Sequence, residues 1–529
     1  MIFNKEIIFF CLLLTIWSPQ VLAQISLPIG GLGGDQVIEV GTYNDKIILA
    51  GTFQQDLNTT WSKGGSDIFL QQYDLQGQLV WEYILGSSNN DQLKAMHCTS
   101  NGTIFSTGSF SDSLFLGLQD TFLYSNQLAI FITKHHSSGQ LIWAKAMQGQ
   151  SLILVEDILS DAQNNSYVTG SFQDSFWVDS THLLVGNSKN TPFVFKLDPL
   201  GNVLWAKTPQ TAEEGTGIAL ALNDQNELYW AGQFKGYFAM ATDSIRAHWI
   251  YNDLFLTKLD SNGVSSMQQH YGGVYNNTCS SLKWQNGRLY LGGSFMGVLE
   301  VDQVRLVTSF RHFDAFVVQL NPNGSANWGI QSHTNSDCFL EDIAFYEDRI
   351  ILCGHYLDSF VWEQGAFFAL EASETFQVTL DSLGQTLGIS SWMGNGFDLI
   401  KAVAVHSSGQ VISVGGFQET MEIDSISIQA TGFSSGFLVI EPILSVINTI
   451  ETPPFSLISI QILPNPAKDS AILSCTECQI SSWTLYNLNG QIVHSGNGSV
   501  IHLNTIASGT YSLQVITNQG IGIEKIVVY

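Results

Sequence analysis

A Gly-x-aromatic tripeptide returns seven times along this chain, and it constrains the fold more than any other feature. Its copies begin at Gly51, Gly108, Gly170, Gly232, Gly293, Gly354 and Gly415, so the steps between them are 57, 62, 62, 61, 61 and 61 residues. A fixed period of this size indicates a repeat architecture, in which each repeat forms one small structural unit.

Each repeat reads as two β-hairpins. The tripeptide ends an apolar, strand-like segment such as 46–50, and a second strand pair surrounds a turn of the form Asp-x-x-Gly, as in Asp74–Gly77. Asp bonds its own backbone in such turns and Gly supplies the positive φ, so turn formation explains this group better than calcium binding does. Two hairpins without a helical period predict one four-stranded antiparallel sheet per repeat.

A tryptophan follows the turn glycine by four residues in four of the repeats, at Trp81, Trp143, Trp205 and Trp328. A large ring at a fixed place in each sheet most simply fills the space between neighbouring sheets. We therefore interpret these tryptophans as packing residues.

Seven four-stranded sheets repeated radially would form a seven-bladed β-propeller. The seventh repeat lacks its last strand, whereas the N-terminal segment Ile25–Pro28 is strand-like and has no partner within its own repeat. We expect Ile25–Pro28 to pair with the last repeat and close the ring. An open solenoid of stacked sheets is the alternative, but it would leave this strand unpaired.

The first residues and the charge indicate an exported protein. Residues 1–23 contain Lys5, the apolar run Ile7–Ile16 and a small-residue end, which is typical of a secretory signal peptide cleaved before Gln24. No later apolar run predicts a transmembrane segment in the mature chain. The net charge of −26 argues against nucleic-acid binding, because it repels phosphate backbones.

Six of the seven cysteines follow the signal peptide, and they do not recur with the repeat. Cys475 and Cys478 form either a local disulfide or two free thiols, because no second pair accompanies them as a structural zinc site requires. A disulfide between Cys338 and Cys353 across a hairpin is also open.

The repeat pattern stops after Ile447. Residues 446–458, with Pro453 and Pro454, predict a stiff linker, and residues 459–529 contain short strands separated by turn residues. Such strands predict a small Ig-like β-sandwich. The expected fold is therefore all-β, with a propeller over residues 24–445 and a second domain over residues 459–529.

Several segments of this second domain occur in an order that resembles the C-terminal sorting domain of type IX secretion substrates. The residues that carry the resemblance are Pro464, Asn465, Pro466, Gly490, Gly509, Tyr511, Lys525 and Val527. The resemblance implies that they form the sorting signal. It also implies Sec export to the periplasm, outer-membrane translocation by the type IX machinery, and a secreted or cell-surface attached product. Residues 24–442 are similar to the secreted β-propeller repeats often found before such tails.

The sequence assigns no catalytic residue, cofactor or metal. Gly432–Gly436 satisfies Gly-x-Ser-x-Gly but falls in a loop between strands, whereas that motif requires a strand-to-helix elbow, so we interpret the match as coincidence. Asp35, Asp91 and Asp157 recur before the inner strand of their repeats, with Glu213, Glu214, Asp342 and Asp398 nearby in theirs. They form either a repeated structural bond or an acidic rim around the central channel.

We therefore predict an exported, non-catalytic binding or adhesion module whose ligand is an extracellular glycan or protein. The alternative is a hydrolase or lyase that acts on extracellular polysaccharide and uses acidic channel residues, because glycoside hydrolysis needs two suitably placed carboxylates. A structural role in a surface layer is the third hypothesis.

Overall fold

The computed structural model describes residues 24–443, 456, 457 and 460–529, except for 59, 118–121, 212, 241–243, 249, 309, 310, 335, 364, 370, 371, 425, 476–478, 487–491, 505, 518 and 519. The regular structure of this part of the chain consists of β-strands. Two compact units are present, one within residues 1–445 and one within residues 446–529. None of the described residues belongs to a helix that is long and apolar enough to cross a bilayer.

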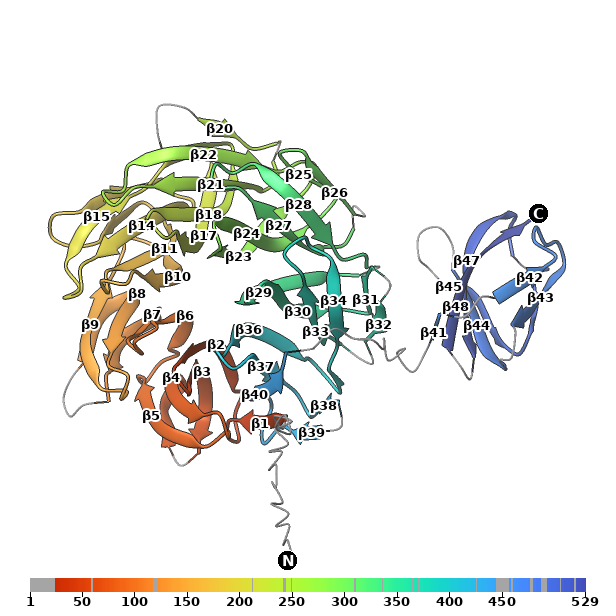
Figure 1. Ribbon diagram of the computed structural model, residues 1–529, viewed down its shortest axis with the longest axis horizontal. Coiled ribbons are helices and arrows are strands. Elements are labelled where there is room, and N and C mark those ends of the chain that lie inside the picture. The colour runs from red at the N-terminus through yellow and green to blue at the C-terminus, as the bar shows by residue number, and fades with distance from the viewer. Residues whose placement is uncertain are drawn as a thin grey trace, which may run out of the picture. The chain divides into compact units, whose positions relative to one another are not determined.

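In the first unit, seven antiparallel sheets of four strands lie around a ring (Figure 1). We number these sheets 1 to 7 in chain order. Sheets 1 to 3 contain β2 (Gln36–Tyr43), β3 (Lys46–Leu57), β4 (Thr60–Asp74) and β5 (Leu79–Leu85); β6 (Gln92–Cys98), β7 (Ile104–Phe115), β8 (Phe122–His135) and β9 (Leu141–Met147); and β10 (Ile153–Ser160), β11 (Ser166–Phe172), β14 (Thr191–Leu197) and β15 (Val203–Lys207).

Sheets 4 to 7 repeat this arrangement. They contain β17 (Glu214–Leu222), β18 (Leu228–Lys235), β21 (Asp253–Leu259) and β22 (Ser265–Tyr271); β23 (Asn277–Gln285), β24 (Arg288–Phe295), β27 (Asp314–Leu320) and β28 (Ala326–Gln331); β29 (Cys338–Tyr346), β30 (Arg349–Tyr356), β33 (Glu374–Leu380) and β34 (Thr386–Ser390); and β36 (Leu399–Val405), β37 (Gln410–Phe417), β40 (Ser435–Pro442) and β1 (Ile25–Ile29).

Short hairpins lie between the second and third strands of sheets 3 to 7, and in sheets 4 and 7 the hairpin also pairs with a short strand that precedes the sheet. They are formed by β12 (Ser175–Trp177) with β13 (Leu183–Val185); β16 (Gln210–Thr211) with β19 (Tyr237–Ala239) and β20 (Ile245–Arg246); β25 (Val298–Val301) with β26 (Val304–Val307); β31 (Ser359–Trp362) with β32 (Gly365–Phe368); and β35 (Met393–Gly394) with β38 (Thr420–Ile423) and β39 (Ile426–Gln429).

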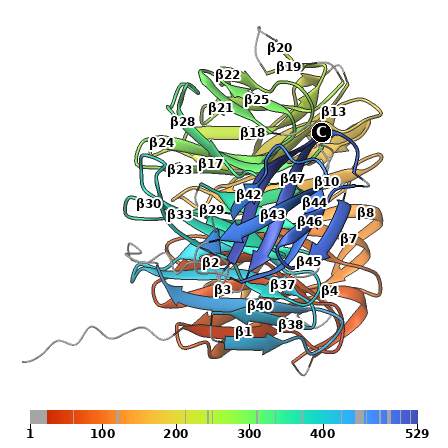
Figure 2. The ribbon, with the colours of Figure 1, turned by 90° about the vertical axis from the view of Figure 1, so that its right-hand side faces the viewer.

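The N-terminal strand completes sheet 7, as the sequence predicts. Strand β1 pairs antiparallel with β40, with Ile25 opposite Ile440 and Ile29 opposite Gly436, and the two strands lie side by side in both views (Figure 1, Figure 2). The expected pairing of Ile25–Pro28 with the last repeat is therefore confirmed.

The junction between sheets 7 and 1 uses the same backbone hydrogen bond as five of the other six junctions. The amide of Asp35, just before β2, donates to the carbonyl oxygen of Ser434 at 3.2 Å. The corresponding bonds elsewhere run from Asp91 to Ser66, Gly215 to Asn190, Asn277 to Asn252, Cys338 to Phe313 and Asp398 to Ser373, at 2.8 to 3.1 Å. The hydrogen bond that closes the ring is therefore of the same kind as those that join neighbouring sheets elsewhere.

The tryptophans pack between neighbouring sheets, as predicted. Their indole N–H groups donate to a carbonyl oxygen in the turn of the next sheet: Trp81 to Ser137, Trp143 to Pro199, Trp205 to Ser261 and Trp328 to Ser382, at 2.9 to 3.3 Å. At the closing junction, Ile25 and Leu27 of β1 lie against Gly77, the turn glycine of sheet 1. Aliphatic side chains there occupy the place of the indole rings.

The Asp-x-x-Gly groups form turns, because their carboxylates bind the turn backbone. Asp74 Oδ1, for example, accepts the amides of Gln76 and Gln78 at 3.0 and 2.8 Å, and Gly77 has φ of +75°.

Cys338 and Cys353 are free and buried, so the disulfide left open by the sequence does not form. The register of their two strands does not place the cysteines opposite each other, since Cys338 lies opposite Tyr356 and Cys353 lies opposite Asp342. Cys475 is disulfide-bonded. Cys478 lies outside the described residues.

The second unit contains two sheets. One has the order β41 (Ser456–Leu457), β48 (Gly520–Val528), β47 (Gly509–Thr517), β44 (Ile480–Tyr486) and β45 (Ile492–Asn497), and the other has β42 (Ile460–Leu463), β43 (Ser470–Cys475) and β46 (Val500–His502). A buried apolar core that includes Trp483, Leu485 and Leu513 holds the unit together.

Candidate functional site

Each inner strand of the ring carries a β-bulge at the same register. The extra residues are Ile38, Lys94, Glu156, Ile218, Ser280, Glu341 and Lys401. A bulge re-aims the side chain that it carries. Five of these residues, from Glu156 to Lys401, line a central cavity of about 400 Å³.

Most charges around this cavity are paired across sheet junctions. Lys94 contacts Glu156 at 2.6 Å, Lys401 contacts Glu341 at 2.8 Å, and Lys283 contacts Asp342 at 2.9 Å. Each pair joins residues from neighbouring sheets, so these charges link the inner strands to one another.

Asp157 and Asp342 share the position that follows the bulge, and both bind the next sheet. Asp157 Oδ2 accepts the amide of Leu220 at 2.8 Å, and Asp342 Oδ2 accepts the amide of Val403 at 3.3 Å. Burial raises the pKa of Asp157 to about 6. These two carboxyl groups therefore form a repeated structural bond, the first of the two sequence interpretations.

The prediction that Asp35, Asp91 and Asp157 share one position is wrong. Asp35 and Asp91, like Asp398, immediately precede the inner strand and are buried, whereas Asp157 lies within it, beyond the bulge. Asp35 accepts the amides of Gly31 and Gln54 at 2.6 and 3.0 Å. Asp157 precedes its tripeptide glycine by only 13 residues, against 16 for Asp35 and 17 for Asp91, so it lies farther along its strand.

Glu39 and His97 line the same cavity, and both have shifted pKa values. Enclosure within the ring raises the pKa of Glu39 well above its usual range, and the charge of Asp342 adds to this effect. Enclosure also lowers the pKa of His97 to about 4. The neutral forms of Glu39 and His97 are therefore favoured where both residues line the cavity.

A second cavity lies between sheets 2 and 3. It is an open cleft of about 550 Å³ whose lining includes Tyr124 of β8, Trp177 of β12, Gln148, Gln150 and Asp179. The aromatic side chains are unusually accessible, with 75% of Tyr124 and 52% of Trp177 exposed. Large apolar rings left in solvent beside a polar cleft are typical of a binding surface.

The polar groups of this cleft are held by local hydrogen bonds. Ser125 donates to Gln148 Oε1 at 2.8 Å and Ser175 donates to Gln150 Oε1 at 2.9 Å, which orients both amides and leaves their NH2 groups as donors on the wall. Burial raises the pKa of Asp179, but hydrogen bonds from Thr181 and His182 outweigh it and hold the value at about 2. The cleft therefore offers fixed donors and an ionised acceptor.

In the second unit, the residues expected to carry sorting come partly together. The amide of Val527 donates to Asn465 Oδ1 at 2.9 Å, and Tyr511 is buried and donates to the carbonyl oxygen of Ala507 at 2.6 Å. Pro464 and Pro466 are exposed, Gly509 begins β47, and Lys525 lies in β48. Gly490 lies outside the described residues.

Sequence reasoning missed the charged residues at the bulges and the aromatic residues of the cleft. Lys94, Glu156, Glu341 and Lys401 occupy equivalent places in four repeats, and this register was the signal that could have found them. Trp177 gave a weaker signal, as a tryptophan outside the periodic series.

Comparison with known proteins gives the second unit a family. Residues 461–529 match the family described as Secretion system C-terminal sorting domain. An uncharacterised WD repeat-containing protein of Acanthamoeba polyphaga mimivirus is 26% identical over 224 residues, which cover 34% of this chain but only 16% of that protein.

The solved structures that resemble the chain do so at low identity. A phage phi92 endosialidase shares 10% identity at a TM-score of 0.38, covering 95% of this chain and 87% of its own. The Pan2 WD40 domain of Neurospora crassa shares 9% at a TM-score of 0.32, covering 68% and 91%. From the family match, residues 461–529 are a secretion system C-terminal sorting domain, which follows a β-propeller-like unit and indicates type IX secretion to an extracellular or cell-surface location.

Proposed function

We propose that this protein is exported through type IX secretion and binds extracellular glycans without catalysis. In this account residues 1–23 are a signal peptide, residues 24–445 form a seven-bladed β-propeller, residues 446–458 are a linker, and residues 459–529 form an Ig-like sorting domain. The seven four-stranded sheets, and the backbone hydrogen bond shared by six of the seven junctions, support the count of blades.

The cleft between sheets 2 and 3 carries the proposal. Sugar rings present apolar C–H faces and a rim of hydroxyl groups. Exposed aromatic rings pack against such faces, as Tyr124 and Trp177 are placed to do. Oriented amides and a carboxylate, supplied by Gln148, Gln150 and Asp179, exchange hydrogen bonds with hydroxyl groups. A glycan uses both kinds of surface at once, whereas an apolar ligand would leave the polar wall unpaired.

In this proposal the sorting domain directs export of the chain, so that the cleft reaches the extracellular space. Pro464, Asn465, Pro466, Gly490, Gly509, Tyr511, Lys525 and Val527 are proposed to carry the signal, and the Asn465–Val527 hydrogen bond supports a shared role for the two ends of the domain. Passage through the periplasm and attachment at the cell surface belong to the same proposal, as does a role in adhesion.

The test is a glycan array with the purified mature chain. We expect binding to a subset of polysaccharides, with an affinity at least tenfold lower in Trp177→Ala and in Tyr124→Ala. Trp61→Ala is the matched control, because Trp61 is 68% exposed but lies outside the cleft. Equal loss in all three variants, or no glycan bound by the wild type, would contradict the proposal.

A polysaccharide hydrolase or lyase is the second candidate, and Glu39 is the observation that favours it. A carboxyl group whose pKa is raised by burial in a cavity is suited to act as a general acid. The paired state of Glu156 and Glu341 weighs against this candidate, because ion pairs with lysine already engage them. Release of reducing ends by the wild type, abolished in Glu39→Gln, would support the enzyme and displace the binding module.

A further inference from the structure

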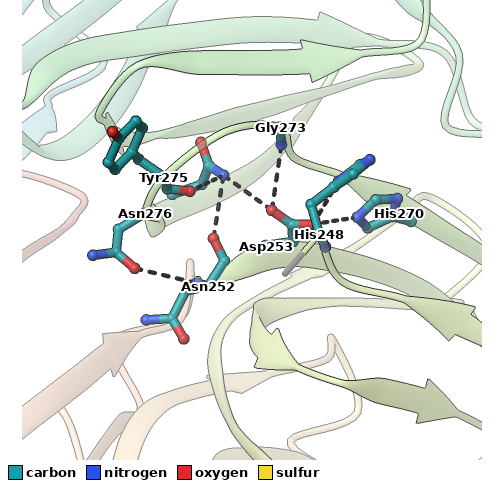
Figure 3. Close-up of polar contacts among 8 residues, drawn as sticks. His248, Asn252, Asp253, His270, Gly273, Tyr275 and Asn276 are labelled. Atoms are coloured by element: carbon teal, nitrogen blue, oxygen red, sulfur yellow. Dashed lines mark hydrogen bonds and ion pairs between the residues drawn. The ribbon is translucent and has the colours of Figure 1, made fainter. Parts of the chain in front are cut away.

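Two imidazoles converge on one buried carboxylate in sheet 4. His248 Nδ1 lies 2.9 Å and His270 Nε2 lies 2.7 Å from the same oxygen, Oδ2 of Asp253 (Figure 3). Asp253 begins β21 and is fully buried, whereas the side chains of His248 and His270 are 49% and 21% exposed. The carboxylate is thus fixed in the fold, and the imidazoles reach it from the solvent side.

The carboxylate has a structural role that does not require histidine. Asp253 lies opposite Phe234 of the repeated tripeptide, and Asp67 and Asp314 hold the same place opposite Phe53 and Phe295. There the carboxylates accept backbone or hydroxyl donors, such as the amide of Lys63 at 2.8 Å and the amide of Thr334 at 3.0 Å. Among the described residues, no histidine contacts Asp67 or Asp314.

Asp253 also receives these structural bonds. Its Oδ2 accepts the amide of His248 at 2.6 Å, and its Oδ1 accepts the amide of Gly273 and the side-chain amide of Asn277 at 3.3 and 3.2 Å (Figure 3). The two imidazoles are therefore additional to what holds the loop in place. Bonds of this kind also orient a carboxylate for metal binding, because outer partners fix the ligating oxygen.

We propose that His248, Asp253 and His270 form a site for a divalent transition metal of the zinc class. The three ligand atoms lie within 4.8 Å of one another. Two imidazoles and a carboxylate suit zinc and its neighbours, whereas calcium and magnesium prefer oxygen ligands alone. Three protein ligands leave one coordination position for water or for a ligand from solution.

The two contacts with Asp253 need only a small adjustment for a metal to bind. Metal–ligand distances of about 2.0–2.1 Å in a tetrahedral site put the ligand atoms roughly 3.3 Å apart. The contacts of 2.9 and 2.7 Å must therefore open by about half an ångström. Both imidazoles can move outward because they are partly exposed. The ring of Phe234 packs edge-to-face against His270, with 5.9 Å between the ring centroids, and limits the rotation of that imidazole.

Metal binding at this site also requires a change of protonation. An imidazole nitrogen that donates to a carboxylate carries a proton, whereas a ligating nitrogen must offer its lone pair.

The test uses the full mature chain after treatment with a chelator. Titration with Zn²⁺ should show one tight equivalent by calorimetry, and Co²⁺ should give the visible absorption of a low-coordinate site. His248→Gln and His270→Gln should each weaken Zn²⁺ binding at least tenfold with an unchanged melting temperature of the metal-free protein. His182→Gln is the control. His182 contacts Asp179 at 2.9 Å, but the two residues belong to no group of three possible metal ligands among the described residues.

Tight binding that survives both His248→Gln and His270→Gln, or that His182→Gln weakens equally, would overturn the site. So would the absence of a tight equivalent in the wild type. None of these outcomes depends on glycan binding, so failure of this site and failure of the proposed function are distinguishable.

Discussion

The amide of Asp35 donates to the carbonyl oxygen of Ser434 across 3.2 Å, and this bond joins the first sheet of the ring to the last. Strand β1 lies beside it in sheet 7, where Leu27 is opposite Leu438 and contacts Gly77 of sheet 1. Closure therefore depends on a short N-terminal strand that serves two sheets at once.

Leu27→Asp should open this junction. A carboxylate in place of Leu27 would lose apolar burial and meet the apolar wall at Gly77, which lowers the free energy of unfolding by about 2 kcal/mol. Denaturant unfolding of the mature chain measures the change. Leu32→Asp is the control, since Leu32 is 60% exposed and its replacement should change stability by less than about 0.5 kcal/mol. Equal effects of the two variants would show that β1 does not close the ring.

Asp398 and Asp91 should each stabilise the fold less as the pH rises from about 4 to about 8. Burial, assisted by the charge of Glu374, raises the pKa of Asp398 to about 8, and burial raises that of Asp91 to about 7. Within this window the two carboxyl groups hold protons in the folded state that they have lost in the unfolded state, so their contribution to the free energy of unfolding declines with pH and levels off above the window.

Asp398→Asn should flatten this decline, because the amide cannot ionise. Melting temperatures between pH 4 and pH 9 provide the measurement. A pH dependence that is the same in Asp398→Asn and in the wild type would contradict the raised pKa of Asp398.

Asp157→Ala should loosen the junction between sheets 3 and 4. Its removal leaves the buried amide of Leu220 without its acceptor, which costs about 1–3 kcal/mol. The exposed Glu213 provides the control, as Glu213→Ala should leave the denaturation midpoint unchanged. A midpoint that Asp157→Ala does not lower would assign the carboxyl group to the cavity rather than to the junction.

Asn465→Ala should impair export. The variant removes the acceptor of the Val527 amide and so loosens the start of the sorting domain from its last strand. We expect the chain to accumulate in the periplasm, as measured by cell fractionation, whereas Lys468→Ala at an exposed neighbouring position should be exported normally. Normal export of Asn465→Ala would separate the motif from sorting.

The period of the chain predicted the sheets, the indole contacts and the closing strand because each depends on a local pattern. Turn residues and a repeated aromatic side chain define the strands of one sheet, and the same pattern in each later repeat defines the next sheet. The pairing of Ile25–Pro28 followed from counting strands, without any knowledge of distances.

The candidate sites escaped prediction because they arise where repeats differ or meet. The bulge moves Glu156 and Lys401 into the channel, and a period counted in whole repeats does not reveal it. The cleft exists only because β8 and the β12 hairpin of different sheets approach each other. His248 and His270 lie on either side of β21, so only the fold brings them to one carboxylate.

Hydrogen exchange of the mature chain, saturated with a glycan from the array, shows whether the ligand lies in the cleft between sheets 2 and 3. We expect protection confined to peptides that cover residues 122–130, 146–150 and 175–179, and its loss in Trp177→Ala. Protection centred on the inner strands β2, β10 and β29, with the cleft unchanged, would place the ligand in the channel instead.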